Sequence, residues 1–194
     1  TIVRIRVGGN AAIASTGGIN ADSRGYVSVL GNGNGPGAGR DASSGGGYGG
    51  AGGGAKGGAA YGDPAAIPRH PGSPGGAYPG GTGGSWQTGG GGGAIQLLSA
   101  GTVVLDGTLS ANGVRGVYPN APGGSGGSIL VVCRKVSGTG LLSANGGTGL
   151  TGGGGGGRIA VWHKTSLAEF DKIFDGLDLG GVETTDPPAG FTGV

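Results

Sequence analysis

The stretch from Ile95 to Asn112, IQLLSAGTVVLDGTLSAN, decides the fold. It joins a short apolar strand, Ile95-Gln96-Leu97, to a tag of the form Gly-x-(Ile/Leu)-(Asn/Ser/Asp)-(Ala/Leu). The same combination occurs four times, and the lead Ile precedes the tag Ile or Leu by 14, 14, 13 and 18 residues. The pairs of lead and tag residues are Ile5 and Ile19, Ile95 and Leu109, Ile129 and Leu142, and Ile159 and Leu177.

The spacing of these copies is typical of stacked repeats. Residues 5–22 align with residues 95–112 without a gap, and the last three tags lie 33 and 35 residues apart. A repeat unit cannot bury its apolar face alone, so it must stack on a neighbour. We therefore expect an all-β fold, a β-solenoid-like stack of short strands with glycine loops at one end. One continuous buried column should contain Ile95, Leu97, Val103, Leu105, Leu109, Ile129, Val131, Leu142, Ile159 and Val161.

Glycine makes up 57 of the 194 residues, several times its usual share of about 7%. Collagen requires glycine at every third position, and runs such as 89–93 and 152–157 break that rule. Large apolar side chains are scarce, with three Phe, two Trp and no Met. Because glycine lets main chains approach closely, we expect extended segments of the polyglycine and polyproline II type, bundled side by side.

The composition divides the chain into four parts. Residues 1–30 form a first repeat unit, 31–93 a Gly/Pro-rich insert, 94–181 three tandem repeat units, and 182–194 a C-terminal tail. Within the last unit, Ser166-Leu167-Ala168-Glu169 matches a capping box and predicts one short helix near 166–175. A lengthened central strand of the repeat is the alternative there.

The sequence contains no constellation that indicates catalysis, a metal site or a cofactor. His70 and His163 lack a Cys or carboxylate at metal-ligand spacing, and Lys56 is followed by neither Ser nor Thr, as a phosphate loop would require. The lone Cys133 lies in an apolar strand, which favours a buried small hydrophobe. We expect a protein that is not an enzyme.

The charges are unevenly placed along the chain. Residues 1–164 carry eleven Lys/Arg and four Asp, a net +7, whereas residues 165–194 carry one Lys and six acids, a net −5. Scattered basic residues do not favour nucleic-acid binding, and no run reaches the roughly 18 apolar residues of a membrane span. This asymmetry suits subunits that meet end to end, and a solvated acidic face is the alternative. The predicted assembly interface comprises Ile2, Arg4, Arg6, Asp171, Asp175 and Asp178.

Four aromatic residues fall among the glycines and prolines of the insert. They are Tyr48, Tyr61, Tyr78 and Trp86. Aromatic rings on extended segments can stack on sugar rings, so a surface polysaccharide is a candidate ligand. The alternative is that these side chains are the bulky packing of a glycine-rich layer.

The units GGSGGSILVV (residues 123–132), GTGLLSANGG (138–147) and GGGGGGRIAV (152–161) resemble the glycine-rich repeats of large secreted bacterial β-solenoid proteins. The resemblance covers residues 94–181 and, less closely, 1–30. The insert is similar in composition to the polyglycine II bundles at the tips of phage adhesins. Neither family carries a catalytic residue to transfer.

These observations together predict an extracellular structural protein, secreted and self-assembling head to tail into a surface fibre or filament. The absence of Met, even at position 1, suggests that Thr1 was created by processing or trimming, as when a secretion signal is removed. A carbohydrate-binding adhesin segment and the non-catalytic part of a secreted polysaccharide-processing protein are the alternatives.

Overall fold

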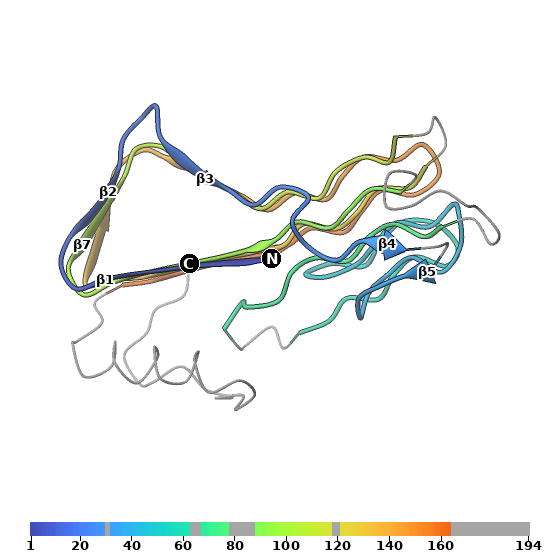
Figure 1. Cartoon of the computed structure of the whole chain (residues 1–194), viewed down its shortest axis with the longest axis horizontal. Helices are drawn as coiled ribbons and strands as arrows, with labels where there is room; N and C mark the ends of the chain where they lie inside the picture. The colour runs from blue at the N-terminus through green and yellow to red at the C-terminus, as the bar shows by residue number, and fades with distance from the viewer. Residues whose placement is uncertain (30–31, 63–66, 78–87, 118–120, 164–194) are drawn as a thin grey trace.

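The structure is a computed structural model that describes residues 1–29, 32–62, 67–77, 88–117 and 121–163. Most of the short β-strands lie on one side of the molecule, and the extended glycine-rich segments lie on the other together with one short strand pair (Figure 1). The chain passes from one side to the other in successive coils that lie on top of one another.

Three coils contribute three strands each, and a last strand begins a fourth coil. The strands are β1 (Ile2–Val7), β2 (Ala11–Ile13) and β3 (Gly18–Asn20) in coil 1; β6 (Ala94–Ser99), β7 (Thr102–Leu105) and β8 (Thr108–Ser110) in coil 2; β9 (Ser128–Val132), β10 (Lys135–Ser137) and β11 (Leu141–Ser143) in coil 3; and β12 (Arg158–Trp162).

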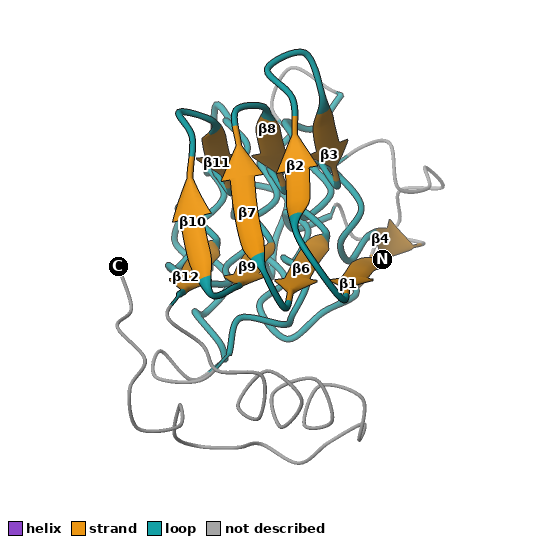
Figure 2. Cartoon of the chain, turned by 90° about the vertical axis from the view of Figure 1, so that its left-hand side faces the viewer, coloured by secondary structure: helices purple, strands orange, loops and turns teal. Residues whose placement is uncertain are grey.

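Equivalent strands of successive coils pair in parallel and form three sheets (Figure 2). Sheet A has the order β1-β6-β9-β12, sheet B the order β2-β7-β10, and sheet C the order β3-β8-β11. A short antiparallel pair, β4 (Ser28–Val29) and β5 (Asn32–Gly33), stands apart from them. We call the end of the stack formed by coil 1 the head and the end formed by β10, β11 and β12 the tail.

The tag residues are in register across sheet C. Leu109 pairs with Ile19 on one side and with Leu142 on the other, as the repeat predicts. In sheet A the lead isoleucines of the later copies are also partners: Ile95 pairs with Ile129, which pairs with Ile159. The three tags and three lead residues were therefore aligned correctly from the sequence.

The equivalence of Ile5 and Ile95 in the gap-free alignment is wrong by two residues. Ile95 pairs with Val3, and Ile5 pairs with Leu97. The offset arises between the second and third strands, where coil 1 has four residues (14–17) and coil 2 has two (106–107). Because side chains alternate along a strand, a shift of two residues leaves the same side chains on the inner face.

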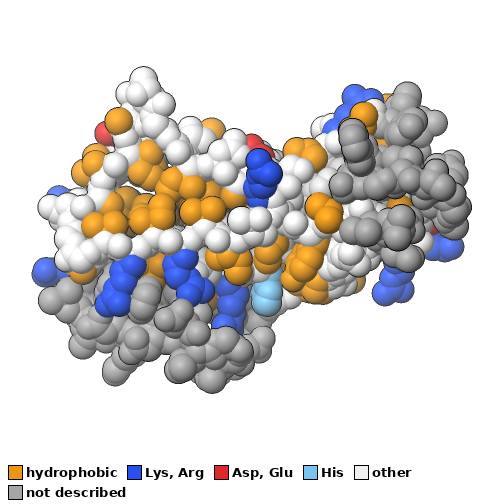
Figure 3. All heavy atoms as spheres, viewed as in Figure 1, with side chains coloured by type: hydrophobic (Ala, Val, Ile, Leu, Met, Phe, Trp, Pro, Cys, Tyr) orange, Lys and Arg blue, Asp and Glu red, His pale blue; other side chains and the backbone are white. Residues whose placement is uncertain are grey.

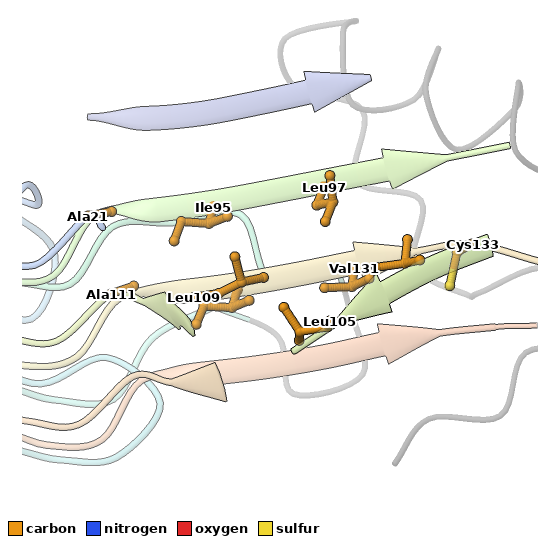
Figure 4. Packing of buried hydrophobic residues seen from close by; sticks show 10 residues of the cluster. Ala21, Ile95, Leu97, Leu105, Leu109, Ala111, Val131 and Cys133 are labelled. Carbon is orange, nitrogen blue, oxygen red and sulfur yellow. The ribbon is translucent and has the colours of Figure 1, made fainter. Parts of the chain in front are cut away.

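The apolar core fills the space enclosed by the three sheets (Figure 4). Seven of the ten residues of the predicted column are buried in this one cluster, and Leu142 and Val161 pack against it. Ile159 is the exception, with 40% of its surface exposed. The seven are Ile95, Leu97, Val103, Leu105, Leu109, Ile129 and Val131.

The glycine-rich side is a hydrogen-bonded bundle. Outgoing segments (21–26, 111–115 and 144–148) leave the third strand of each coil, and return segments (89–93, 122–127 and 152–157) lead back to the next coil. Their backbone bonds repeat every third residue. The N–H groups of Gly123 and Gly126 donate to the carbonyl oxygens of Gly152 and Gly155 (2.9 and 3.0 Å).

The next residues of the same return segment turn to a different neighbour. The N–H groups of Gly124 and Gly127 donate to the carbonyl oxygens of Val114 and Ala111 (3.1 and 2.8 Å). A repeat of three residues is that of the polyproline II helix. This helix has no internal hydrogen bonds, so its N–H and C=O groups must bond to neighbouring segments. On this side of the molecule, hydrogen bonds between neighbouring segments thus take the place of a hydrophobic core.

The insert forms further layers of the same bundle. Gly72 and Gly75 donate their N–H groups to Gly92 O and Gly89 O (2.8 and 2.9 Å) of the first return segment. At the tail, Gly53 N–H donates to Gly153 O (2.8 Å) of the last one. The insert and the repeat units therefore share one bundle.

The prediction of a β-solenoid is wrong. The strands form three parallel sheets of three or four strands, and after its third strand each coil leaves the sheets for the glycine bundle (Figure 1). The glycine runs assigned to loops form a bundle because extended backbone must pair laterally. The stack of short parallel strands in that prediction is present. The described residues contain no helix, and the helix predicted near 166–175 lies outside them.

Candidate assembly interface

Both ends of the strand stack present open sheet edges. At the head, β1, β2 and β3 each pair with a strand of coil 2 and have no second partner among the described residues. At the tail, β12, β10 and β11 are the corresponding edge strands. Open edges expose unpaired N–H and C=O groups that can pair with another chain.

The pairing pattern shows which backbone groups of β1 point outward. Ala94 N–H donates to Thr1 O (3.1 Å) and Ala100 N–H to Val7 O (2.9 Å), so the odd-numbered residues of β1 face β6. In a parallel ladder the alternate residues face the other way. The backbone groups of Ile2, Arg4 and Arg6 therefore point outward at the head.

The same reasoning applies to β2. Ile13 O accepts from Asp106 N–H (2.9 Å), so Ile13 faces β7 and Ala12 faces away from it. Ala12 is also exposed. Its N–H group is thus part of the open edge of sheet B.

Burial of the core depends on position along the stack. The members of the core cluster that are only partly buried all lie in the end coils: Ile5, Ala11, Ile13 and Ile19 in coil 1, and Val136, Leu142 and Val161 at the tail. Viewed onto the head, hydrophobic side chains reach the surface between the strands of coil 1 (Figure 3). The core is therefore only partly covered at both ends of the stack in the described part of the chain.

The predicted interface residues on β1 are placed differently from one another. Ile2 is 49% exposed. Arg4 donates from Nε to Oε1 of Gln96 (2.8 Å), its partner on β6, and Arg6 lies two residues further along the same face. The arginine side chains therefore leave the outer face of sheet A. Asp171, Asp175 and Asp178 lie outside the described residues, so their pairing with Arg4 and Arg6 stays a prediction.

The described aromatic residues of the insert are packed inside it. Tyr48 is completely buried, and its ring centroid lies 4.8 Å from that of Tyr61 at an interplanar angle of 46°. Burial raises the pKa of both phenols, and Tyr61 accepts a hydrogen bond from Ser73 Oγ (3.2 Å). Tyr48 thus offers no surface for a sugar ring. Tyr78 and Trp86 lie outside the described residues.

Arg158 fastens the insert to the start of β12, a role the sequence did not reveal. Its Nη2 donates to Tyr61 O and Gly62 O (3.0 and 2.9 Å), and its guanidinium carbon lies 5.5 Å from the Tyr48 ring centroid. Such a cation–π contact is favourable when it is shielded from water. Almost a hundred residues separate the partners, so no local motif could have indicated this contact.

A second set of residues missed from the sequence lies at the corners between strands. Here an Asn or Asp side chain of one coil accepts a hydrogen bond from a backbone N–H of the next coil. The pairs are Asn10 with Thr102 (2.8 Å), Asp22 with Asn112 (2.6 Å), Asp106 with Thr139 (3.2 Å) and Asn112 with Asn145 (2.7 Å). We call this set the corner ladder. For Asp22 and Asn112 the signal was that each closes a tag, whereas Asn10 and Asp106 lie outside the tags.

The corner ladder gives the stack a direction, because every acceptor side chain belongs to the coil nearer the head. At the tail, Asn145 has no donor to its Oδ1 among the described residues. At the head, the N–H of Asp22 is satisfied within its own coil by Asn20 Oδ1 (2.9 Å). The two ends are therefore chemically different surfaces.

The described residues contain no group of His, Cys, Asp or Glu side chains arranged to hold a metal ion. Nor do they include a helix of the length and apolar character that crossing a membrane requires. No family model, curated protein or solved structure matches this chain.

Proposed function

We propose that this chain is a structural subunit that assembles head to tail with copies of itself into a fibre. The observation that carries this proposal is the pair of open ends. All three sheets terminate at the head in unpaired edges and do so again at the tail among the described residues. The same apolar core reaches the surface at both ends.

Strand pairing and apolar burial would supply the affinity. In sheets B and C the core residues of coil 2 are buried between two coils, whereas those of coils 1 and 3 have a coil on one side only among the described residues and are partly exposed. A neighbouring copy would give the end coils the missing side. Burial of apolar surface contributes about 25 cal/mol per Å², and stable interfaces bury about 1,200–2,000 Å² in total.

The difference between the two ends sets the geometry of the assembly. A contact between two different surfaces of the same subunit propagates into a fibre unless its rotation closes a ring. Surface charge pairs contribute about 0–1 kcal/mol each, so we assign the basic head and the acidic segment 165–194 to orientation. Among the described residues sheet A extends one strand beyond sheets B and C at the tail, and this step would fix the register further.

We place this fibre outside the cell, at the surface or secreted. The support is the composition and the similarity of the glycine-rich units to secreted repeat proteins. The burial of Tyr48 between Tyr61 and Arg158 gives no support to a sugar-stacking surface at that position.

The test is the state of association of the full chain, measured by sedimentation and electron microscopy. The wild-type chain should form species that grow with concentration. A variant with a blocked sheet edge, Ala12→Pro, should remain smaller at every concentration. A wild-type chain that is monomeric throughout would remove the proposal.

A further inference from the structure

The return segments of coils 2 and 3 show how an edge of the glycine bundle is covered. In the first, Gly89 and Gly92 donate their N–H groups to Pro122 O and Ser125 O (both 2.9 Å) of the next return segment. In the second, Gly123 and Gly126 donate to Gly152 O and Gly155 O (2.9 and 3.0 Å). Two equivalent glycines thus bind the following segment in the same way twice.

These four positions also require glycine for a steric reason. A Cβ at Gly89, Gly92, Gly123 or Gly126 would overlap a backbone carbonyl oxygen of the outgoing segment packed against it. The oxygens belong to Val114, Ala111, Gly147 and Ala144 respectively. Any larger residue would force two backbones apart.

Gly153 and Gly156 occupy the equivalent positions in the last return segment, because Arg158 pairs with Ser128 and Ser128 pairs with Ala94. Neither N–H has an acceptor among the described residues. A Cβ at Gly156 would meet nothing within 4 Å, and one at Gly153 would lie 3.8 Å from Gly147 O. Two unpaired donors and two glycines without an internal steric reason therefore lie on the last return segment, although Gly53 and Gly49 of the insert donate to the carbonyl oxygens of the same two residues.

The head carries a matching feature. Gly9 is equivalent to Gly101 in coil 2, and a Cβ at Gly101 would overlap Asn10 of the coil before it. A Cβ at Gly9 itself would meet nothing within 4 Å. Position 9 is thus a glycine although only a preceding coil would require one there.

We infer that the edge formed by Gly153 and Gly156 binds an extended, glycine-rich segment of a second copy of this chain. The inference rests on the proposed head-to-tail assembly and names its contact on the glycine side. A second copy is the occupant because the equivalent glycines of the two preceding return segments bind the next return segment of this same chain, and a further coil would supply that segment here. The segment must offer two carbonyl oxygens three residues apart, which is what an extended glycine segment of this bundle provides.

Alanine substitutions test this inference in the full chain. Gly156→Ala and Gly153→Ala should leave the thermal unfolding midpoint of the dilute protein unchanged or slightly raised, because the backbone is not in the left-handed region and the methyl group has space. Gly9→Ala should behave likewise. Each should weaken association at least tenfold in sedimentation equilibrium, since the space beyond the equivalent glycines of the internal coils is filled by an outgoing segment or, for Gly9, by a corner residue, which here the second copy would supply. Gly8→Ala is the matched control, because its equivalent in coil 2 is Ala100 and a Cβ is tolerated there.

The outcomes separate the inference from the proposed function. A wild-type chain that never associates overturns both. If the wild type associates and Gly156→Ala associates equally well, the inference alone is overturned. A Gly156→Ala variant that unfolds more readily when dilute shows that residues of the same chain cover this edge, which also overturns it. Weakened association with an unchanged unfolding midpoint supports it.

Discussion

Ile129 and Ile159 are direct partners on neighbouring strands of sheet A, yet Ile129 is completely buried and Ile159 is 40% exposed. Both side chains point to the inner face of the sheet. The difference arises because β9 has a strand on each side, whereas β12 is the edge of sheet A in the part of the chain that the structure describes. Exposure of an aliphatic side chain that belongs to the core column marks the tail as a surface that needs a partner.

This relationship predicts opposite effects of two substitutions. Ile129→Ala should lower the free energy of unfolding by about 2–5 kcal/mol, because it leaves a cavity in a closed core. Ile159→Lys should change the stability of the dilute protein little and should suppress association, since a charged side chain at an open edge opposes pairing. Chemical denaturation and sedimentation measure the two effects. A strongly destabilised Ile159→Lys chain would show that the tail is already covered.

The open edge of sheet B can be tested by removing one N–H group. Ala12→Pro deletes an outward-facing donor without deleting a bond to β7, so folding should be retained and association weakened. Ala12→Ser keeps the donor and serves as the control. Equal association of the two variants in sedimentation would show that β2 takes no part in assembly.

The corner ladder should contribute to stability through Asn112. Its Oδ1 accepts from Asn145 N–H and from Ser143 Oγ (both 2.7 Å). Asn112→Ala should therefore cost about 1–2 kcal/mol in the free energy of unfolding, because the partly buried hydroxyl of Ser143 and the exposed N–H of Asn145 both lose their acceptor. Asn145→Ala should cost less, since its Oδ1 has no donor among the described residues. Equal losses for the two variants would argue against a directional ladder.

Burial raises the pKa of the Cys133 thiol from 9.0 to about 11. The folded state then holds this proton more tightly than the unfolded state. Its contribution to stability is therefore complete below the ordinary pKa and is lost as the pH rises through about 11. The unfolding midpoint should fall more steeply between those values in the wild type than in Cys133→Ala. Parallel pH profiles would contradict a buried, protonated thiol.

The sequence contained the strand repeats but not the way in which the glycines pair. The tags Ile19, Leu109 and Leu142 were aligned correctly because each occupies the same position on the third strand of its coil. The two-residue error at Ile5 arose because the turn 14–17 of coil 1 is two residues longer than the turn 106–107 of coil 2. Nothing in the small residues of that turn marks the difference in length. Neighbours in the glycine bundle could not be predicted, since glycine has no side chain to distinguish one segment from another.

The candidate interface was also only partly predictable. The exposed strand at the head follows from the sequence, because residues 1–7 alternate as a strand does. The direction of the Arg4 and Arg6 side chains does not, since it depends on which face of sheet A they share with Gln96. In the sequence nothing distinguishes Gly153 and Gly156 from the other glycines. Only the structure shows that their N–H groups have no acceptor among the described residues.

Sedimentation velocity of the full chain across micromolar concentrations, at low and at high salt, tests the head-to-tail assembly most directly. Species that grow with concentration are expected at both salt levels, because strand pairing and apolar burial supply the affinity and charge sets orientation. Electron microscopy of the same samples should show fibres. A single species of 18.0 kDa at every concentration and at both salt levels would contradict the account.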